Sequence, residues 1–136
     1  MKIKNIFDIA GRAMAAQMVR LNTISSNLAN AGATTGDPET VYKPLKPEFK
    51  TQYSENVKKN GISTVNVSKV VELQKEPFKI FDPNHPLADG DGYIYKAPIN
   101  VEEEMVDMMD ASRQYQNNIE VVTTLKALTL KTINLG

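Results

Sequence analysis

The first quarter of the chain carries apolar residues at alternating steps of three and four. The positions are Phe7, Ala10, Met14, Gln17, Leu21, Ile24, Leu28 and Ala31, and all but Gln17 are apolar. This spacing keeps one side of an α-helix apolar and is typical of the seam of a coiled coil. It predicts a helix over residues 4–31, about 42 Å long, with Gly32 as its C-terminal stop.

A second long helix is predicted over residues 101–134. Asn100 is a suitable N-cap, three glutamates (Glu102, Glu103 and Glu104) lie in the first turn, and Lys126 and Lys131 lie near the end. Acidic groups at the start of a helix and basic groups at its end complement the helix dipole. The predicted seam is Val101, Met105, Met108, Ser112, Tyr115, Ile119 and Val122, followed by a change of phase to Leu125, Leu128, Thr132 and Leu135.

The segment between the helices, residues 36–99, has a different character. Proline and glycine are concentrated there, and short β-like runs are predicted at 41–45, 62–71, 77–81 and 92–95, with a polar loop at 51–61. We therefore expect an α+β chain. Long N- and C-terminal helices (1–35 and 100–136) form an α-helical coiled coil, and residues 36–99 form a small β-rich middle domain.

The composition argues against several classes of function. Lys plus Arg equals Asp plus Glu at 16 each, so the chain has no overall field to attract nucleic acid. There is no Cys and only one His, His85, so the chain has few residues that could serve as zinc ligands or as a catalytic base. We expect no catalytic residues, cofactor or metal, and no direct insertion into a membrane.

Two local motifs suggest metal or catalytic chemistry but favour simpler interpretations. Asp89 to Gly92 begins like a calcium-binding loop, yet the twelfth position holds Asn100 where such a loop requires Glu. The run Glu102 to Glu104 fits a helix start better than a pair of catalytic carboxylates.

Two stretches of the predicted helices lack charge altogether. Residues 21–36 and 114–119 contain no Asp, Glu, Lys or Arg. A helix facing solvent normally carries charges on its outer side, so these neutral faces are expected to be covered by neighbouring subunits. The pattern is equally compatible with a two-helix hairpin that packs only on its own middle segment.

Several blocks resemble a known family. Residues 13–17 and 20–31 resemble the N-terminal signature of flagellar rod and hook proteins. The blocks at 85–93, 101–106, 111–118 and 130–136 narrow the resemblance to proximal rod proteins, whereas residues 45–76 show little that matches.

This resemblance implies a structural subunit of the flagellar basal-body rod, in the proximal part of the drive shaft that crosses the periplasm. It implies partners among other rod proteins, copies of itself, the surrounding ring proteins and the flagellar type III export apparatus. It also implies export without a cleaved signal peptide, which agrees with the charged and polar residues Asp8, Arg12 and Gln17 near the start.

On this interpretation, apolar residues of the two helices meet within the subunit. They are Phe7, Met14, Leu21, Ile24 and Leu28 on the first helix, and Met105, Met108, Tyr115, Ile119 and Val122 on the second. Neutral polar residues are expected to contact neighbouring subunits: Asn22, Ser26, Asn27, Asn30, Gln116 and Asn117.

Three other functions compete with this interpretation. A membrane-surface protein is suggested by Lys2, Lys4, Arg12 and Arg20 around an apolar stripe. An enzyme would need a convergent charged pocket. A secretion chaperone would bind client segments without polymerising.

Overall fold

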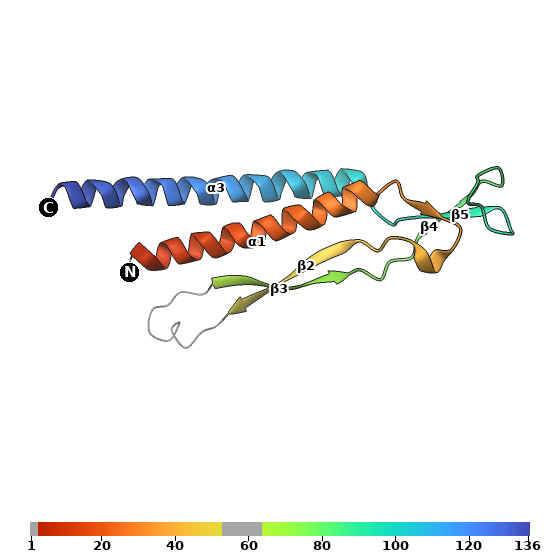
Figure 1. Ribbon diagram of the computed structural model, residues 1–136, viewed down its shortest axis with the longest axis horizontal. Helices are drawn as coiled ribbons and strands as arrows, with labels where there is room; N and C mark the ends of the chain where they lie inside the picture. Colours follow the sequence, from red (N-terminus) through yellow and green to blue (C-terminus); the bar gives the residue numbers. More distant parts are fainter. Residues whose placement is uncertain (1–2, 53–63) are drawn as a thin grey trace.

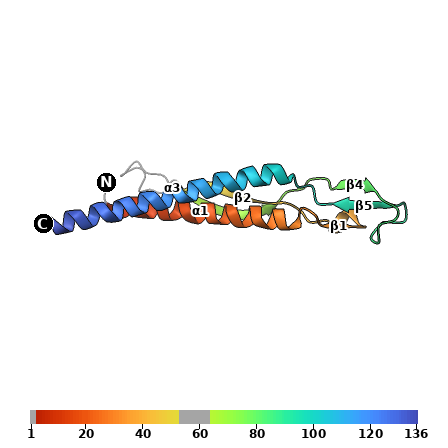
Figure 2. The same cartoon turned by 90° about the horizontal axis from the view of Figure 1, so that it is seen from above.

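The computed structural model describes residues 3–52 and 64–136 as an elongated molecule. Its elements in chain order are α1 (Ile3–Asn30), β1 (Thr34–Thr35), η1 (Pro38–Thr40), β2 (Leu45–Gln52), β3 (Thr64–Glu72), β4 (Phe78–Phe81), β5 (Tyr93–Lys96) and α3 (Val101–Asn134). The two long helices lie side by side along the long axis and run in opposite directions (Figures 1 and 2). The small sheet that contains β4 and β5 lies at the end away from the chain termini (Figure 1).

Both helices occur where the periodicity predicts them. Helix α1 covers 28 residues and α3 covers 34. Asn100 caps α3 as expected, because its side-chain oxygen accepts hydrogen bonds from the backbone N–H groups of Glu102 (3.0 Å) and Glu103 (3.3 Å). At the other end, the backbone N–H of Leu135 donates to the carbonyl of Lys131.

Strands β2 and β3 form a two-stranded antiparallel hairpin that lies along α1. Leu45 pairs with Glu72 and Gln52 with Thr64, and the register shifts between Glu48 and Phe49. Helix α1 therefore has two neighbours, α3 on one side and this hairpin on another (Figure 1).

The second sheet is three-stranded, in the order β1, β5, β4, and all its pairs are antiparallel. It is joined to the end of α1 by a small apolar core of Ala31, Val41, Ala97 and Ile99. Ala31 comes from the predicted N-terminal segment, and the other three residues come from the predicted middle domain. The predicted boundary between these two domains, at residues 35 and 36, therefore stays a prediction.

Part of the predicted β structure is wrong. The predicted strands at 64–71, 77–81 and 92–95 coincide with β3, β4 and β5 to within one residue, and residues 62 and 63 lie outside the described residues. Of the predicted run 41–45, only Leu45 is in a strand. There the chain leaves the short η1 helix, Val41 enters the apolar core, and β2 begins only at Leu45. The predicted loop at 51–61 is wrong for residues 51 and 52, which belong to β2, and residues 53–61 lie outside the described residues.

The fold buries mostly small side chains. Ala97 and Ala111 are completely buried, and among the described residues no large side chain is. Ala111 is the one buried residue of α3, and large apolar side chains remain exposed along that helix. None of the described helices is both long and apolar enough to cross a bilayer.

Candidate assembly interface

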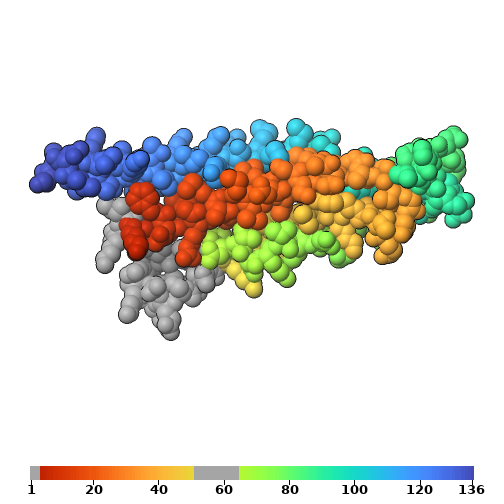
Figure 3. Space-filling view, in the orientation of Figure 1, coloured from red at the N-terminus to blue at the C-terminus, as the bar shows by residue number. Residues whose placement is uncertain are grey.

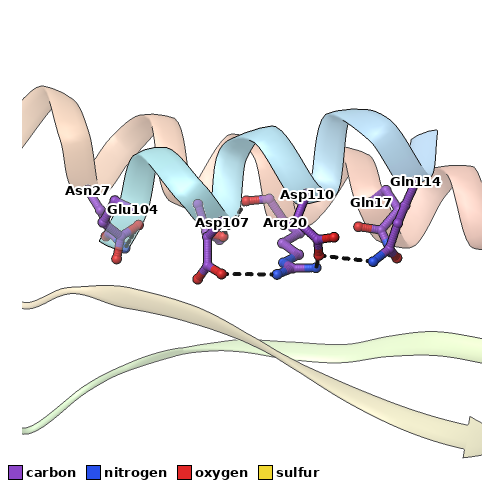
Figure 4. A network of polar contacts seen from close by, with 8 residues as sticks. Gln17, Arg20, Asn27, Glu104, Asp107, Asp110 and Gln114 are labelled. Carbon is purple, nitrogen blue, oxygen red and sulfur yellow. Dashed lines mark hydrogen bonds and ion pairs between the residues drawn. The ribbon is translucent and has the colours of Figure 1, made fainter. Parts of the chain in front are cut away.

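Polar contacts between α1 and α3 define how the two helices pair. Gln17 Nε2 donates to Gln114 Oε1 (2.9 Å), and the Arg20 guanidinium donates to Asp107 (3.2 Å) and Asp110 (3.0 Å). Figure 4 shows these side chains in one row on the side of the helix pair that faces the hairpin. These contacts hold the two helices in this antiparallel register.

Asn27 joins three segments of the chain. Its Oδ1 accepts from the backbone N–H of Leu45 (2.8 Å) and from the Tyr42 hydroxyl (3.1 Å). Its Nδ2 donates to the Leu45 carbonyl (3.0 Å) and to Glu104 Oε2 (3.2 Å). The amide thus uses all its hydrogen-bonding capacity within the chain.

The buried position of Asn27 corrects its predicted role. The side chain is 2% exposed, so it is not available to a neighbouring subunit in this arrangement. Ser26 is also turned inward, with its Oγ 2.8 Å from the Tyr42 hydroxyl. Asn30 is half-buried and donates to the Ser26 carbonyl (2.8 Å).

Three other neutral residues remain candidates for contact with neighbours. Asn22, Gln116 and Asn117 are exposed on the helix surfaces. Their role as interface residues stays a prediction.

The α1 seam lies on the packed side of its helix. Ile24 is buried, and Phe7, Met14, Leu21 and Leu28 are half-buried. These side chains can therefore pack within the subunit, as predicted from their spacing.

The predicted α3 seam is partly wrong. Ser112 of the predicted seam is half-buried, and the other least exposed positions are Glu104, Met108, Ala111, Tyr115, Asn118, Val122, Leu125 and Thr129, which form a regular heptad without a change of phase. We call this set the inner stripe. Met108, Tyr115 and Val122 belong to it, whereas Met105 (55% exposed) and Ile119 (42% exposed) face away.

The error has a physical reason at two positions. The prediction placed Met105 and Ile119 inward because each is more apolar than its neighbour, Glu104 or Asn118. In the structure Glu104 faces inward because Asn27 hydrogen-bonds it, and Ala111 faces inward because it allows the helices to approach closely.

Apolar side chains that the inner stripe does not use lie on the surface of α3. Met105, Val106 and Met109 are exposed near its start, and Leu130, Ile133 and Leu135 near its end. A row of exposed apolar residues on one long helix is typical of a surface that another protein covers. This outer surface of α3 is the candidate assembly interface.

Two carboxyl groups have shifted pKa values with structural causes. Burial raises the pKa of Glu104, and the hydrogen bond from Asn27 offsets part of that effect. For Asp89 the pKa is lowered, first by the hydrogen bond from the Tyr93 backbone N–H (2.8 Å), with further bonds from Asp91 N–H and the Tyr95 hydroxyl. Asp89 thus closes the turn before β5 instead of pointing its oxygens toward a calcium ion.

The sequence does not reveal most of the polar network. Arg20, Asp107, Asp110, Gln17 and Gln114 were not predicted to interact, although Asp107 and Asp110 are one helical turn apart and Arg20 lies on the predicted seam side of α1. In the described ranges, 3–52 and 64–136, no three His, Cys, Asp or Glu side chains are grouped as metal ligands would be.

Comparison with known proteins identifies the family. Residues 7–36 match the family model described as "Flagella basal body rod protein", and residues 91–135 match "Flagellar basal body rod FlgEFG protein C-terminal". The flagellar basal-body rod protein FlgC of Salmonella typhimurium is 43% identical over 136 residues, covering all of this chain and 99% of the relative. The chain belongs to the FlgC family of flagellar basal-body rod proteins.

Other FlgC proteins show a similar match over their whole length. The FlgC proteins of Escherichia coli O157:H7 and Yersinia enterocolitica are 42% and 40% identical, and each alignment covers 100% of this chain and 99% of the relative. The two family models cover most of α1 with β1, and all of β5 and α3, so they include the helices that form the candidate interface.

The first prediction concerns the hydrogen bonds of Asn27. Replacing Asn27 with Ala removes the partner of the half-buried N–H and carbonyl of Leu45, so we expect the free energy of unfolding to fall by about 2–4 kcal/mol. Urea unfolding followed by circular dichroism measures this loss. The exposed control Asn22→Ala is expected to change stability by less than about 0.5 kcal/mol. Equal stability of the two variants would contradict the role of Asn27.

The second prediction concerns the pH dependence of stability. A carboxyl whose folded-state pKa is raised contributes stability that is present below its ordinary pKa and is lost as pH rises through the folded-state value. Gln at position 104 keeps an oxygen for Asn27 without the buried charge. The stability of Glu104→Gln relative to wild type should therefore rise between pH 3.5 and pH 7, by less than about 1 kcal/mol.

Thermal unfolding across this pH range checks the prediction. Glu103→Gln removes an exposed charge from the same helical turn and serves as the matched control. A relative stability of Glu104→Gln that stays constant, or falls, as pH rises would refute the assignment.

Proposed function

We propose that the chain is a structural subunit of the flagellar basal-body rod that polymerises through its terminal helices into the proximal part of the drive shaft. The observation that carries this proposal is the helix pair itself. Its inner surfaces are held together by apolar and polar contacts, while apolar side chains remain exposed along the outer surface of α3. Membership of a family of rod proteins supports other rod subunits as the partners of that exposed surface.

The proposed role is mechanical. The inner surfaces of the helix pair stabilise the subunit, and the outer surface of α3 binds neighbouring subunits. The inner stripe, the Asn27 hydrogen bonds and the Arg20 ion pairs keep α1 and α3 in one register. The outer surface of α3 is left for neighbours. Contacts between two different surfaces of identical or related subunits do not close on themselves and generate an open helical assembly.

The proposal includes the partners and location of the family. Neighbours are other rod proteins and copies of this chain, the surrounding ring proteins enclose the rod in the periplasm, and the flagellar type III apparatus exports the chain without a cleaved signal peptide. The chain acts without catalysis or a cofactor, as the relatives' names as rod proteins support.

A genetic test uses a flagellated bacterium that lacks its own FlgC. We expect the wild-type chain to restore rods and swimming. Leu21→Asp, which places a charge in the half-buried α1 seam, should abolish both, because an unpaired carboxylate there disrupts the packing of the helices. Swimming in soft agar and electron microscopy of basal bodies are the measurements.

A matched control separates this effect from charge alone. Val70→Asp makes the same change at an exposed position of β3 and is expected to leave swimming intact. Normal motility of Leu21→Asp, or failure of the wild-type chain to form rods at normal expression, would contradict the proposed function.

A further inference from the structure

The sulfur atoms of this chain all belong to methionines. The sequence has six Met and no Cys, so a thioether is the only sulfur group that an oxidant can reach. Three of the six, Met105, Met108 and Met109, lie within five residues of one another at the start of α3. Two others, Met14 and Met18, lie on α1. The start of α3 is therefore the place where sulfur is most concentrated.

Two methionines of the α3 group are the most exposed of those described. Met105 is 55% exposed and Met109 is 64% exposed, whereas Met108 belongs to the inner stripe and is half-buried. On α1, Met18 is 43% exposed and Met14 is half-buried. Figure 3 shows the start of α3, in cyan and light blue, at the edge of the molecule away from the hairpin. Because the oxidation of a thioether follows its exposure, Met105 and Met109 should react first.

Met105 and Met109 also share one site. They are four residues apart and so lie on the same face of α3. A depression of about 380 Å³ on this helix is lined by Met105, Met108, Met109, Ser112, Arg113 and Gln116. Both exposed thioethers therefore border one hollow on the outer surface of α3, which a small oxidant can enter.

We propose that Met105 and Met109 form a methionine-oxidation site on the unassembled chain, and that their oxidation blocks the outer surface of α3 from binding a neighbouring subunit. The oxidant is a two-electron oxygen donor of the peroxide class, such as hydrogen peroxide. The sulfur lone pair attacks one peroxide oxygen, and an S–O bond forms as the O–O bond breaks. The departing hydroxide takes the proton of the attached oxygen and leaves as water. Each thioether is thereby oxidised to a sulfoxide, and the peroxide is reduced.

The sulfoxide changes the character of the depression. Oxidation turns a flexible apolar side chain into a polar one whose oxygen accepts hydrogen bonds. Arg113 and Gln116 carry N–H donors for that oxygen in the same depression. A neighbour that covers the surface with apolar side chains has to remove the oxygen from water, which costs free energy unless a new hydrogen bond replaces the lost one. The oxidised depression therefore suits water better than an apolar neighbour.

The blocking effect rests on the proposed function and deepens it, because it adds a control on which copies can join the rod. Once a neighbour covers the outer surface of α3, the oxidant no longer reaches Met105 and Met109. The reaction is reversible, since methionine sulfoxide reductases restore the thioether while a dithiol is oxidised to a disulfide and water is released. The site is therefore a chemical switch that acts before assembly and not after it.

The order of oxidation in solution tests the site without reference to assembly. The dilute full-length chain is treated with hydrogen peroxide, and peptide mass spectrometry follows the gain of one oxygen atom at each methionine. Met105 and Met109 should convert at least about threefold faster than Met14 and Met108. The same reaction in concentrated urea is the control, because all methionines are then exposed and their rates should converge. Equal rates in the folded chain would overturn the oxidation site.

Paired substitutions test whether polarity at this site blocks assembly. In a bacterium that lacks its own FlgC, Met105→Gln/Met109→Gln places a polar group like the sulfoxide at both positions. The matched control Met105→Leu/Met109→Leu keeps both positions apolar at similar volume. The Gln pair should reduce the number of rods at least about tenfold, and the Leu pair should assemble like wild type. Both positions are exposed, so circular dichroism of the purified variants should be unchanged.

A sublethal pulse of hydrogen peroxide during expression links the effect to oxidation. The host for this experiment also lacks its methionine sulfoxide reductases. Rod numbers should fall at least about threefold more for wild type than for the Leu pair, which has no thioether at the site. An equal fall for the two chains, or loss of rods with the Leu pair before any pulse, would overturn the proposal.

The outcomes also separate this inference from the proposed function. If wild type and the Gln pair form rods equally well, the switch is refuted while the role in the rod stands. If wild type forms no rods even without oxidant, the proposed function fails and the blocking effect fails with it. In that case the order of oxidation in solution still decides whether Met105 and Met109 are the reactive pair.

Discussion

Helix α1 holds the molecule together because it packs against α3 on one side and against the β2–β3 hairpin on another. Asn27 lies where these three elements meet and hydrogen-bonds the start of β2 and the first turn of α3. The hydrogen bond from Asn27 to Glu104 turns Glu104 toward α1. This contact therefore decides which face of α3 stays exposed. The exposed methionines near the start of α3 are a consequence of the inward placement of Glu104.

The arrangement explains how a small chain can form part of a rigid shaft. A globular protein of this size would bury large apolar side chains in a core, but here five of the nine buried apolar residues among those described are alanines. Close helix contact stiffens the pair along its length, and the larger apolar side chains stay on the surface. Neighbouring subunits would bury those side chains, so part of the stabilising free energy of the subunit is gained only on assembly.

The fold class and both helices could be predicted from the sequence because a heptad spacing over some thirty residues is a strong signal. The side of α3 that faces inward could not be predicted in the same way. Met105 is more apolar than its neighbour Glu104, and Ile119 is more apolar than Asn118, so a search for apolar positions selects the wrong residue of each pair. Strand β2 was missed because Pro47 and alternating charges weaken its pattern, although a hairpin edge tolerates proline. Asn27 was assigned outward because a neutral amide gives no sign of its partner, which lies 18 residues away.

The central claim is that the chain is a rod subunit in which α1 and α3 form the assembly surface. Electron cryomicroscopy of intact basal bodies from a strain whose only FlgC is this chain tests it most directly. The account predicts that density for α1 and α3 lies toward the rod axis, with the outer surface of α3 covered by neighbouring subunits. Density that leaves the outer surface of α3 exposed, or basal bodies whose rod does not contain the chain, would contradict it.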